Sequence, residues 1–397
     1  MSTRRIISTL SYTTFFGLCV ILTVRVAARA DAAKYDPCAP GRDPVATTTC
    51  ERRPIDLVIC LDTSGSMEAL IDSARARLWD IVTSLSHARP TPDLRVGLLT
   101  YGSPSRSTAS QGWVVRQIDL TSDLDTVYGK MMSFGTDGGD EFVGWVLHEA
   151  IDSINWSRDP RALKLLFVAG NESADQARDV FDFRREVATA RTRGITVNSI
   201  YAGDRSAGIA ERWEEVAACG GGHYSAIDMR CGTIQIETPQ DRVLFELNMK
   251  LNATYVPFGD AGRSGAANQA AQDANAEQLG RASGASRVAA KATALYQNSR
   301  WDLVDAVTKG EVELKKMKEA DLPAPMRRMA PADRDQYLEQ ARANRAEIQR
   351  QIATVSAERE AVLRAEKDKV GGGKTALDDA VLAAIRKQAS EQGFKFE

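Results

Sequence analysis

The chain has 397 residues and nearly balanced charges, with 51 lysines and arginines against 53 aspartates and glutamates. This length allows one α/β domain of ordinary size together with additional segments. The charge balance excludes a global basic field for nucleic acid and a global acidic field for a cationic partner, so any binding surface must be local.

The first 30 residues have the features of an export signal. Two arginines near the start precede an apolar run, and Ala28-Arg29-Ala30 fits the small-residue cleavage pattern. An uncleaved membrane anchor is the alternative, but serines and threonines dilute the run below the length of a membrane span. We predict a signal peptide over residues 1–30, a mature chain that starts at Asp31 without a stable membrane span, and a periplasmic or secreted location.

Signal cleavage would remove Cys19 and leave five cysteines, so at least one thiol must lack a partner within the chain. Cys60 is the expected free thiol because it lies inside an apolar run. The sequence does not fix the connectivity of the others. Two short-range disulfides could form in an oxidising compartment: Cys38 with Cys50, and Cys219 with Cys231.

After an N-terminal segment of residues 31–53, residues 54–259 alternate short apolar runs with helical periods, which is typical of a parallel sheet with crossover helices. Several runs are almost entirely apolar, as expected for strands buried on both faces. The second and third runs are joined by a short polar loop, which predicts an antiparallel hairpin at one edge. Six strands are expected: 55–61, 94–101, 113–120, 163–169, 195–201 and 223–227.

Helical periodicity fills the intervals between these strands. The clearest case places apolar residues at spacings of three and four from Met67 to Leu85. Pro239 stands where the first turn of a helix tolerates proline. Further helices are expected over residues 122–132, 143–154, 175–193, 209–218 and 240–251 and, near the end of the chain, 331–369 and 377–389.

The composition changes in the last third of the chain. Residues 260–290 are rich in alanine, glycine, glutamine and asparagine, so we assign 260–330 as an Ala/Gly-rich helical or linker region. Residues 331–397 follow as a helical, coiled-coil-like tail in which Arg345 and Arg359 interrupt an apolar seam. Two interpretations stay open for this tail, which could self-associate or pack back on the main domain.

A motif of oxygen-bearing side chains directly follows the first predicted strand and precedes a long helix. It reads Asp62-Thr63-Ser64-Gly65-Ser66. Three oxygen groups at alternate positions of a tight turn can converge on one point, and Gly65 permits the turn. The carboxyl end of a central parallel strand is where open α/β folds place ligands. A carboxylate with two hydroxyls suits Mg²⁺, with Ca²⁺ or Mn²⁺ as alternative occupants.

This succession of strand, Asp-x-Ser-x-Ser motif and helix resembles the metal-ion-dependent adhesion site of von Willebrand factor A-type domains, over about residues 54–230. The resemblance implies a doubly wound, mostly parallel sheet of six strands and a divalent metal held by Asp62, Ser64 and Ser66. In this family the metal keeps an open position that an acidic side chain of a protein partner fills. The expected function is metal-dependent protein binding.

The resemblance also implies ligands from two later loops, where this sequence departs from the family pattern. The family's threonine lies just before the third helix, and counting back from that helix places Asp140 there, with Thr136 four residues earlier. Either could reach the metal directly or through water. The other loop usually reads Thr-Asp-Gly, but this chain has Gly170, Asn171 and Glu172 there. Asn171 or Glu172 could substitute for the absent aspartate.

Two other functions stand as alternatives. The chain could be a structural envelope protein without a functional metal site, in which Ser66 caps the following helix and the tail oligomerises. It could also be an accessory subunit of a larger complex, as intracellular domains of this family are beside ATPases, although the predicted export signal argues against that role. Segments such as Trp301-Asp302-Leu303 look similar to those that accompany these domains in some exported bacterial proteins.

Enzymatic activity and nucleic-acid binding are not expected. The three histidines, His87, His148 and His223, have no cysteine or acidic partner at catalytic or zinc-site spacing. The serines of the motif do not lie in the Gly-x-Ser-x-Gly turn of hydrolases. The basic pair Arg327 and Arg328 is too small for a nucleic-acid patch.

Overall fold

The computed structural model describes residues 52–227, 236–369 and 377–396. All of them belong to the unit formed by residues 37–397. The predicted signal peptide and the cysteines Cys38, Cys50 and Cys231 lie outside the described residues. Within the described ranges, the helices lack any stretch with the length and apolarity that a membrane span requires.

A single mixed sheet contains all six predicted strands: β1 (Arg53–Asp62), β3 (Pro92–Tyr101), β4 (Val115–Thr121), β5 (Leu163–Gly170), β6 (Ile195–Ala202) and β7 (Gly221–Ile227). They lie in the order β4-β3-β1-β5-β6-β7. Neighbours pair in parallel except β3 and β4, which form the predicted antiparallel edge hairpin. The chain leaves β1 toward one side of the sheet and later returns to its other side, so the strand order reverses at β1, where such folds bind ligands.

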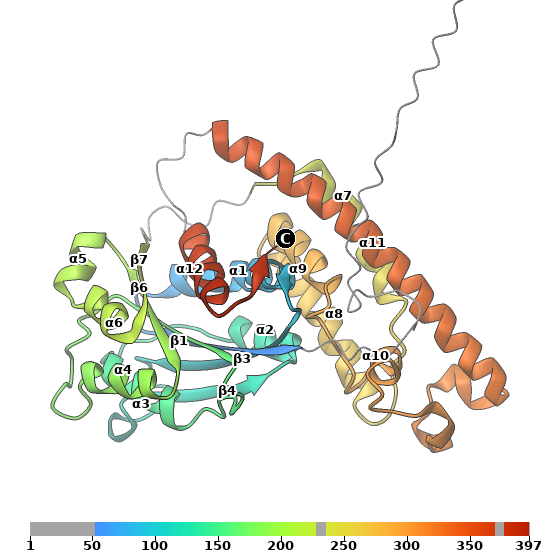
Figure 1. The fold of residues 1–397 in the computed structure, drawn as a ribbon, viewed down its shortest axis with the longest axis horizontal. Helices are drawn as coiled ribbons and strands as arrows, with labels where there is room; N and C mark the ends of the chain where they lie inside the picture. Colours follow the sequence, from blue (N-terminus) through green and yellow to red (C-terminus); the bar gives the residue numbers. More distant parts are fainter. Residues whose placement is uncertain (1–51, 228–235, 370–376, 397) are drawn as a thin grey trace, which may run out of the picture. The chain divides into compact units, whose positions relative to one another are not determined.

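Side chains alternate along β1 and build a core on each face of the sheet. Ile55, Leu57 and Leu61 face one helix layer, whereas Val58 and Cys60 face the other. Cys60 is buried and free, as its apolar surroundings predict. Figure 1 shows the two layers on opposite sides of the strands. The first includes α1 (Glu68–Ser86), α2 (Leu124–Met132), α9 (Arg281–Lys291) and α12 (Leu377–Glu391), and the second includes α3 (Val143–Asp152), α4 (Phe183–Thr192) and α6 (Trp213–Gly220).

Two predicted helices differ from the structure. The helix predicted over 175–193 is reduced to α4, because the carboxylate of Asp182 accepts a hydrogen bond from the Arg184 amide and starts the helix there. The helix predicted over 209–218 is divided into α5 (Arg205–Ala210) and α6, because Arg212 has a left-handed φ of 70°. A residue in that conformation ends a right-handed helix. The spacing of apolar residues predicts neither the N-cap at Asp182 nor the left-handed conformation of Arg212.

The chain after β7 forms further helices beside the α1 and α2 layer: α7 (Pro239–Asn252), α8 (Gly262–Gln278), α9, α10 (Leu303–Thr308) and α11 (Pro331–Lys369). Pro239 occupies the first turn of α7, as predicted. The segment 260–290 holds α8 and α9, and its small residues lie where helices approach other groups closely. A Cβ added to Gly265 would lie 2.2 Å from the ring of Trp301. The Ala/Gly-rich composition therefore reflects close packing.

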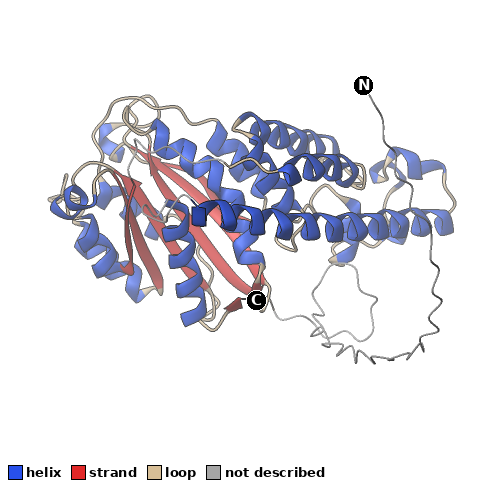
Figure 2. Cartoon of the chain, turned by 90° about the horizontal axis from the view of Figure 1, so that it is seen from above, coloured by secondary structure: helices blue, strands red, loops and turns tan. Residues whose placement is uncertain are grey.

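Helix α11 runs along α7, as Figure 1 shows. It is the long helix that crosses the view in Figure 2. The two arginines that interrupt its apolar seam point inward and form buried ion pairs. Arg345 contacts Asp302 at 2.7 Å and Asp305 at 2.8 Å, and Arg359 contacts Asp241 at 2.7 Å. These charges fix α11 against α7 and α10, which is why a continuous apolar seam is absent. Self-association of the tail stays a prediction.

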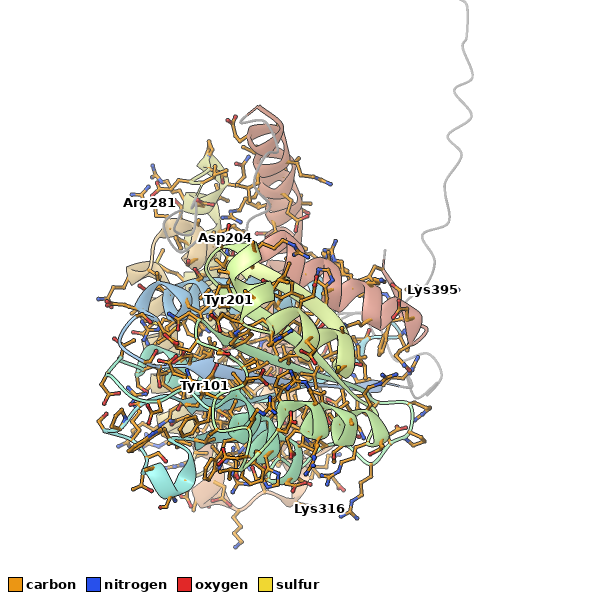
Figure 3. The ribbon with its side chains drawn as sticks, turned by 90° about the vertical axis from the view of Figure 1, so that its left-hand side faces the viewer. Tyr101, Tyr201, Asp204, Arg281, Lys316 and Lys395 are labelled. Carbon is orange, nitrogen blue, oxygen red and sulfur yellow. The ribbon has the colours of Figure 1, made fainter. Side chains whose placement is uncertain are left out.

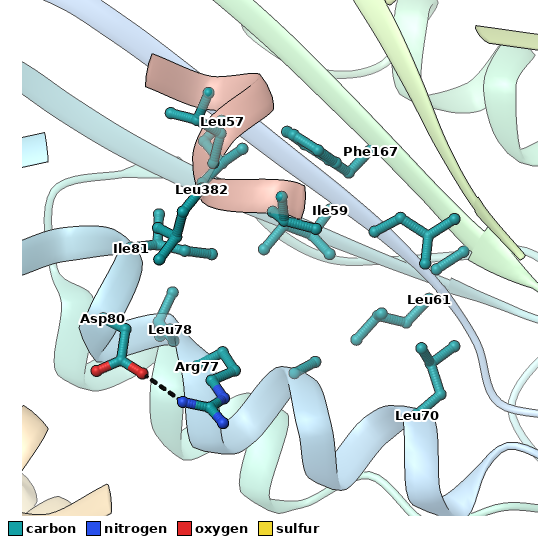
Figure 4. Close-up of a pocket in the computed structure, with 15 residues that line it drawn as sticks. Leu57, Ile59, Leu61, Leu70, Arg77, Leu78, Asp80, Ile81, Phe167 and Leu382 are labelled. Atoms are coloured by element: carbon teal, nitrogen blue, oxygen red, sulfur yellow. Dashed lines mark hydrogen bonds and ion pairs between the residues drawn. The ribbon is translucent and has the colours of Figure 1, made fainter. Parts of the chain in front are cut away.

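Helix α12 returns to the sheet from the far end of the chain. Gln388 and Asn198 of β6 exchange two side-chain hydrogen bonds of 2.7 and 3.2 Å. The short strand β8 (Lys395–Phe396) then pairs with β2 (Ala88–Arg89). An apolar cavity lies between α12, α1 and the sheet, with Ile59, Phe167 and Leu382 among its lining residues (Figure 4).

Candidate metal centre

The Asp62-to-Ser66 motif forms a turn at the carboxyl end of β1, between β3 and β5. The amide and the hydroxyl of Thr63 both donate to the Tyr101 carbonyl, at 2.9 and 3.0 Å, and fasten the turn to the end of β3. The Ser64 amide donates to Asp62 Oδ1 at 2.7 Å. The turn therefore fixes one carboxylate oxygen of Asp62, whereas the other, Oδ2, has no hydrogen bond from any residue that the structure describes.

The structure does not give Ser66 the helix-capping role considered from the sequence. The N-cap of α1 is Met67, and no side chain makes a capping hydrogen bond there. The Ser66 hydroxyl instead accepts a hydrogen bond of 2.9 Å from Asn171 Nδ2. Because Asn171 directly follows β5, this contact joins the loop after β1 to the loop after β5.

Four buried oxygens around this turn have no hydrogen-bond partner among the described residues: Asp62 Oδ2, Ser64 Oγ, Glu141 Oε2 and Asn171 Oδ1. Three of these side chains surround Gly102, since a Cβ placed there would lie 2.8 Å from Asp62 Oδ1, 3.1 Å from Glu141 Cγ and 3.4 Å from Ser64 Cβ. A buried polar atom without a partner costs about 1–3 kcal/mol. A group of such acceptors fits a cation, whose bonds would satisfy them together.

The electrostatics of the turn also fit a cation. Burial raises the pKa of Asp62 to about 8, and the charge of Glu141 adds to the rise. Burial likewise raises the pKa of Glu141 to about 7, with contributions from the charges of Glu172 and Asp140. The nearby Ser64 hydroxyl lowers the pKa of both carboxyl groups, although its distance or angle to them does not qualify as a hydrogen bond. The main causes that raise the two pKa values are burial and acidic neighbours, so a divalent cation would supply a compensating charge.

The loop before α3 contains the two predicted ligands Asp140 and Thr136 and also Glu141, and of these three only Glu141 is buried. Asp140 is exposed, and its carboxylate accepts a long contact of 3.5 Å from Trp113 Nε1. Thr136 is half-buried in the same loop. Glu141, which the sequence analysis did not select, is the acidic residue that lies against Asp62. The acidic pair before the helix was the available signal, but in extended backbone a shift of one residue reverses the side to which a side chain points.

The loop after β5 explains why the usual aspartate is absent. A Cβ at Gly170 would lie 2.4 Å from the Tyr101 hydroxyl oxygen and 3.2 Å from Asp62 Oδ2, so a larger side chain does not fit. That hydroxyl donates to the Ala169 carbonyl at 2.9 Å. Figure 3 shows Tyr101 in the body of the molecule, whereas Lys316 lies at its margin. Asn171, one residue further, supplies the free oxygen Oδ1 instead.

Within the described ranges, no three histidine, cysteine or acidic side chains gather as a metal cluster. The candidate centre therefore depends on hydroxyl and amide oxygens as well as on the carboxylates of Asp62 and Glu141. Such an all-oxygen set suits hard cations such as Mg²⁺ and Ca²⁺ better than transition metals, which favour nitrogen and sulfur.

The chain resembles several solved structures at low sequence identity. Proximal thread matrix protein 1 from the mussel byssus is 14% identical over 46% of this chain and 43% of its own, with a TM-score of 0.35. One form of that protein has a zinc-occupied metal-ion-dependent adhesion site (TM-score 0.34). The pilus adhesin SpaC from Lactobacillus rhamnosus GG is 17% identical over 45% of this chain and 28% of its own, with a TM-score of 0.35. The chain thus spans less than half the length of either protein.

The family assignment has a separate basis. No curated protein matches the chain. Residues 56–229 match the family model of the von Willebrand factor type A domain. This range covers the six-stranded sheet from β1 to β7 and its crossover helices, in agreement with the resemblance noted in the sequence. Residues 56–229 are therefore a von Willebrand factor type A domain, which the described C-terminal helices accompany.

Proposed function

We propose that this protein is an exported, non-enzymatic module that binds another protein through a divalent cation, with Mg²⁺ as the expected ion. The observation that carries the proposal is the set of four buried, unpartnered oxygens at the carboxyl end of β1. Asp62, Ser64, Glu141 and Asn171 would hold the ion, and Ser66 is the remaining hydroxyl of the motif. The proposal of export depends on the first 30 residues.

The ligand set has a consequence for the partner. Two carboxylates, Asp62 and Glu141, would balance the charge of a divalent ion, which favours retention of the ion. The same balance weakens the long-range attraction of an acidic partner, so the binding energy would come from direct contact at the remaining coordination position. We therefore propose a partner that presents an acidic side chain and that dissociates when the ion is removed. The C-terminal helices could additionally support self-association.

Capture of partners from envelope extract tests this function. The mature chain, immobilised with Mg²⁺ or with EDTA, is compared with the Asp62→Ala variant in Mg²⁺. We expect one or more proteins to be retained only by the wild-type chain with Mg²⁺, because the variant lacks the carboxylate that anchors the ion. The proposal is wrong if the retained proteins are the same in all three samples. A structural role without metal gives that result.

Substitution of neighbouring acidic residues tests the assignment of Glu141. We expect Glu141→Gln to weaken Mg²⁺ binding at least tenfold, because it removes a buried carboxylate that faces Asp62. Asp140→Asn is the matched control, since Asp140 is exposed and directed to Trp113. It should change the affinity by less than threefold. Titration calorimetry with Mg²⁺ measures both, and a larger effect at Asp140 would reverse the assignment.

A further inference from the structure

The amine of Lys291 is fully buried in a polar cluster between three helices. Its Nζ donates to Asn252 Oδ1 at 2.6 Å and to Asn248 Oδ1 at 2.9 Å, both on α7. It also contacts Asp273 of α8, at 2.8 Å from Oδ2 and 3.0 Å from Oδ1. Lys291 itself ends α9 and has no exposed surface. An amine is therefore held against two carboxamides and one carboxylate, away from solvent.

The surroundings lower the pKa values of both Lys291 and Asp273. Burial lowers the pKa of Lys291 to about 8, so the neutral, nucleophilic amine is accessible near physiological pH. Burial alone would raise the pKa of Asp273, but the charges of Arg287 and Lys291 hold it below its usual range. Arg287 Nε donates to Asp273 Oδ1 at 2.6 Å. Asp273 is therefore ionised, and it would hold a proton only briefly while passing it on.

We propose that Lys291 and Asn252 form an intramolecular isopeptide bond. The Lys291 Nζ attacks the side-chain carbonyl carbon of Asn252, a new C–N bond forms, and the bond from that carbon to Asn252 Nδ2 breaks. Asp273 Oδ2 contacts both nitrogens, at 2.8 Å each, so it takes the proton from Nζ and passes it to Nδ2. The products are a secondary amide and one molecule of ammonia, and no oxidant or cofactor is needed.

Two features select Asn252 over Asn248. The Asn252 carbonyl accepts the shorter hydrogen bond from Nζ, 2.6 Å against 2.9 Å, so the amine lies closer to the carbonyl group of Asn252 than to that of Asn248. Asn252 is also half-buried, whereas Asn248 is buried, so ammonia can leave toward solvent from Asn252. Helices α7, α8 and α9 hold all three side chains in place before reaction. This rigid positioning is what raises the rate of an intramolecular reaction.

Mass spectrometry of the purified mature chain tests the proposal. The expected mass is lower, by one ammonia molecule, than the mass calculated from the sequence and the observed N-terminus. Trypsin cleaves after lysine and arginine, so the bond would give a branched peptide that joins residues 251–263 to residues 288–300. An intact chain with its full calculated mass, and free peptides 288–291 and 292–300, would overturn the proposal.

Three variants separate the bond from a structural ion cluster. Lys291→Arg and Asn252→Ala are expected to keep the full calculated mass, and Asn248→Ala is expected to lose ammonia as the wild type does. Asp273→Asn preserves the shape of the side chain but removes the proton acceptor. We therefore expect this variant to form no bond and to have its full calculated mass. Asn248 lies in tryptic peptide 243–250, so a branch at that peptide would contradict the choice of Asn252. Since the wild-type mass decides the main point, a variant that fails to fold leaves the test intact.

Discussion

Replacement of Asp62 by alanine is expected to abolish the rise in melting temperature that Mg²⁺ gives the wild-type protein. A ligand at one hundred times its dissociation constant stabilises a folded protein by about 2.7 kcal/mol. For a domain of this size, that corresponds to a rise of about 5 °C or more. Asp62 is buried, its Oδ2 has no hydrogen-bond partner in the described part of the chain, and the variant would lose the anchoring carboxylate. Thermal unfolding in EDTA and in millimolar Mg²⁺ measures the difference.

The control for Asp62 is the same substitution at an exposed acidic residue outside the site. Asp179 is exposed in the turn region before α4, so Asp179→Ala should retain the whole Mg²⁺ response. Equal responses in the wild type, Asp62→Ala and Asp179→Ala would remove the ion from this turn. This test does not involve a partner, so it separates failure of metal binding from failure of protein binding.

Replacement of Arg287 by methionine is expected to lower the free energy of unfolding by about 3–5 kcal/mol, because it removes the ion-pair partner of Asp125 and one of the two cationic partners of Asp273. Arg287 is 1% exposed and links the A domain to the helical extension. Its guanidinium contacts Asp125 of α2 at 2.7 Å and Asp273 of α8 at 2.6 Å, and it lies 4.6 Å from the ring centre of Trp79. Chemical denaturation measures the loss.

Two further variants show whether the loss comes from the buried charge. Arg242 is 86% exposed and pairs with Glu246 on the surface of α7, so Arg242→Met should change the free energy of unfolding by less than about 0.5 kcal/mol. The double variant Asp125→Asn with Arg287→Met removes one of the stranded charges. It should be more stable than the sum of the two single effects predicts. Simple additivity would contradict the ion-pair explanation.

The sheet could be predicted from the sequence because its physical signal is local. A strand buried on both faces must be apolar at nearly every position, and Val58 and Cys60 face one core while Leu57 and Leu61 face the other. Several helices of the extension could also be predicted from their periodicity, but the way in which they pack could not. Their packing comes from long-range charge pairs such as Arg345 with Asp302, which lie 43 residues apart.

The candidate site was predictable to the extent that it lies on one turn. Asp62, Ser64 and Ser66 could be chosen because spacing within a turn is visible in the sequence. Glu141 could not be distinguished from Asp140, because the side to which a loop residue points depends on the backbone and not on the residue type. The glycine at position 170 has its explanation in Tyr101, whose hydroxyl fills the space that a side chain would need. That contact joins β3 to β5, which are far apart in the sequence, so no local sequence pattern predicts it.

The return of α12 and β8 to the sheet makes the A domain discontinuous in sequence. Val381, Ile385 and Phe394 belong to the same apolar core as Leu57 and the inward face of α1. A fragment that stops at residue 229 would leave that face open to water, and we expect it to aggregate. This side of the core is complete only when α12 is in place. Proteolysis before residue 377 would remove α12 and uncover the apolar face of β1 and α1.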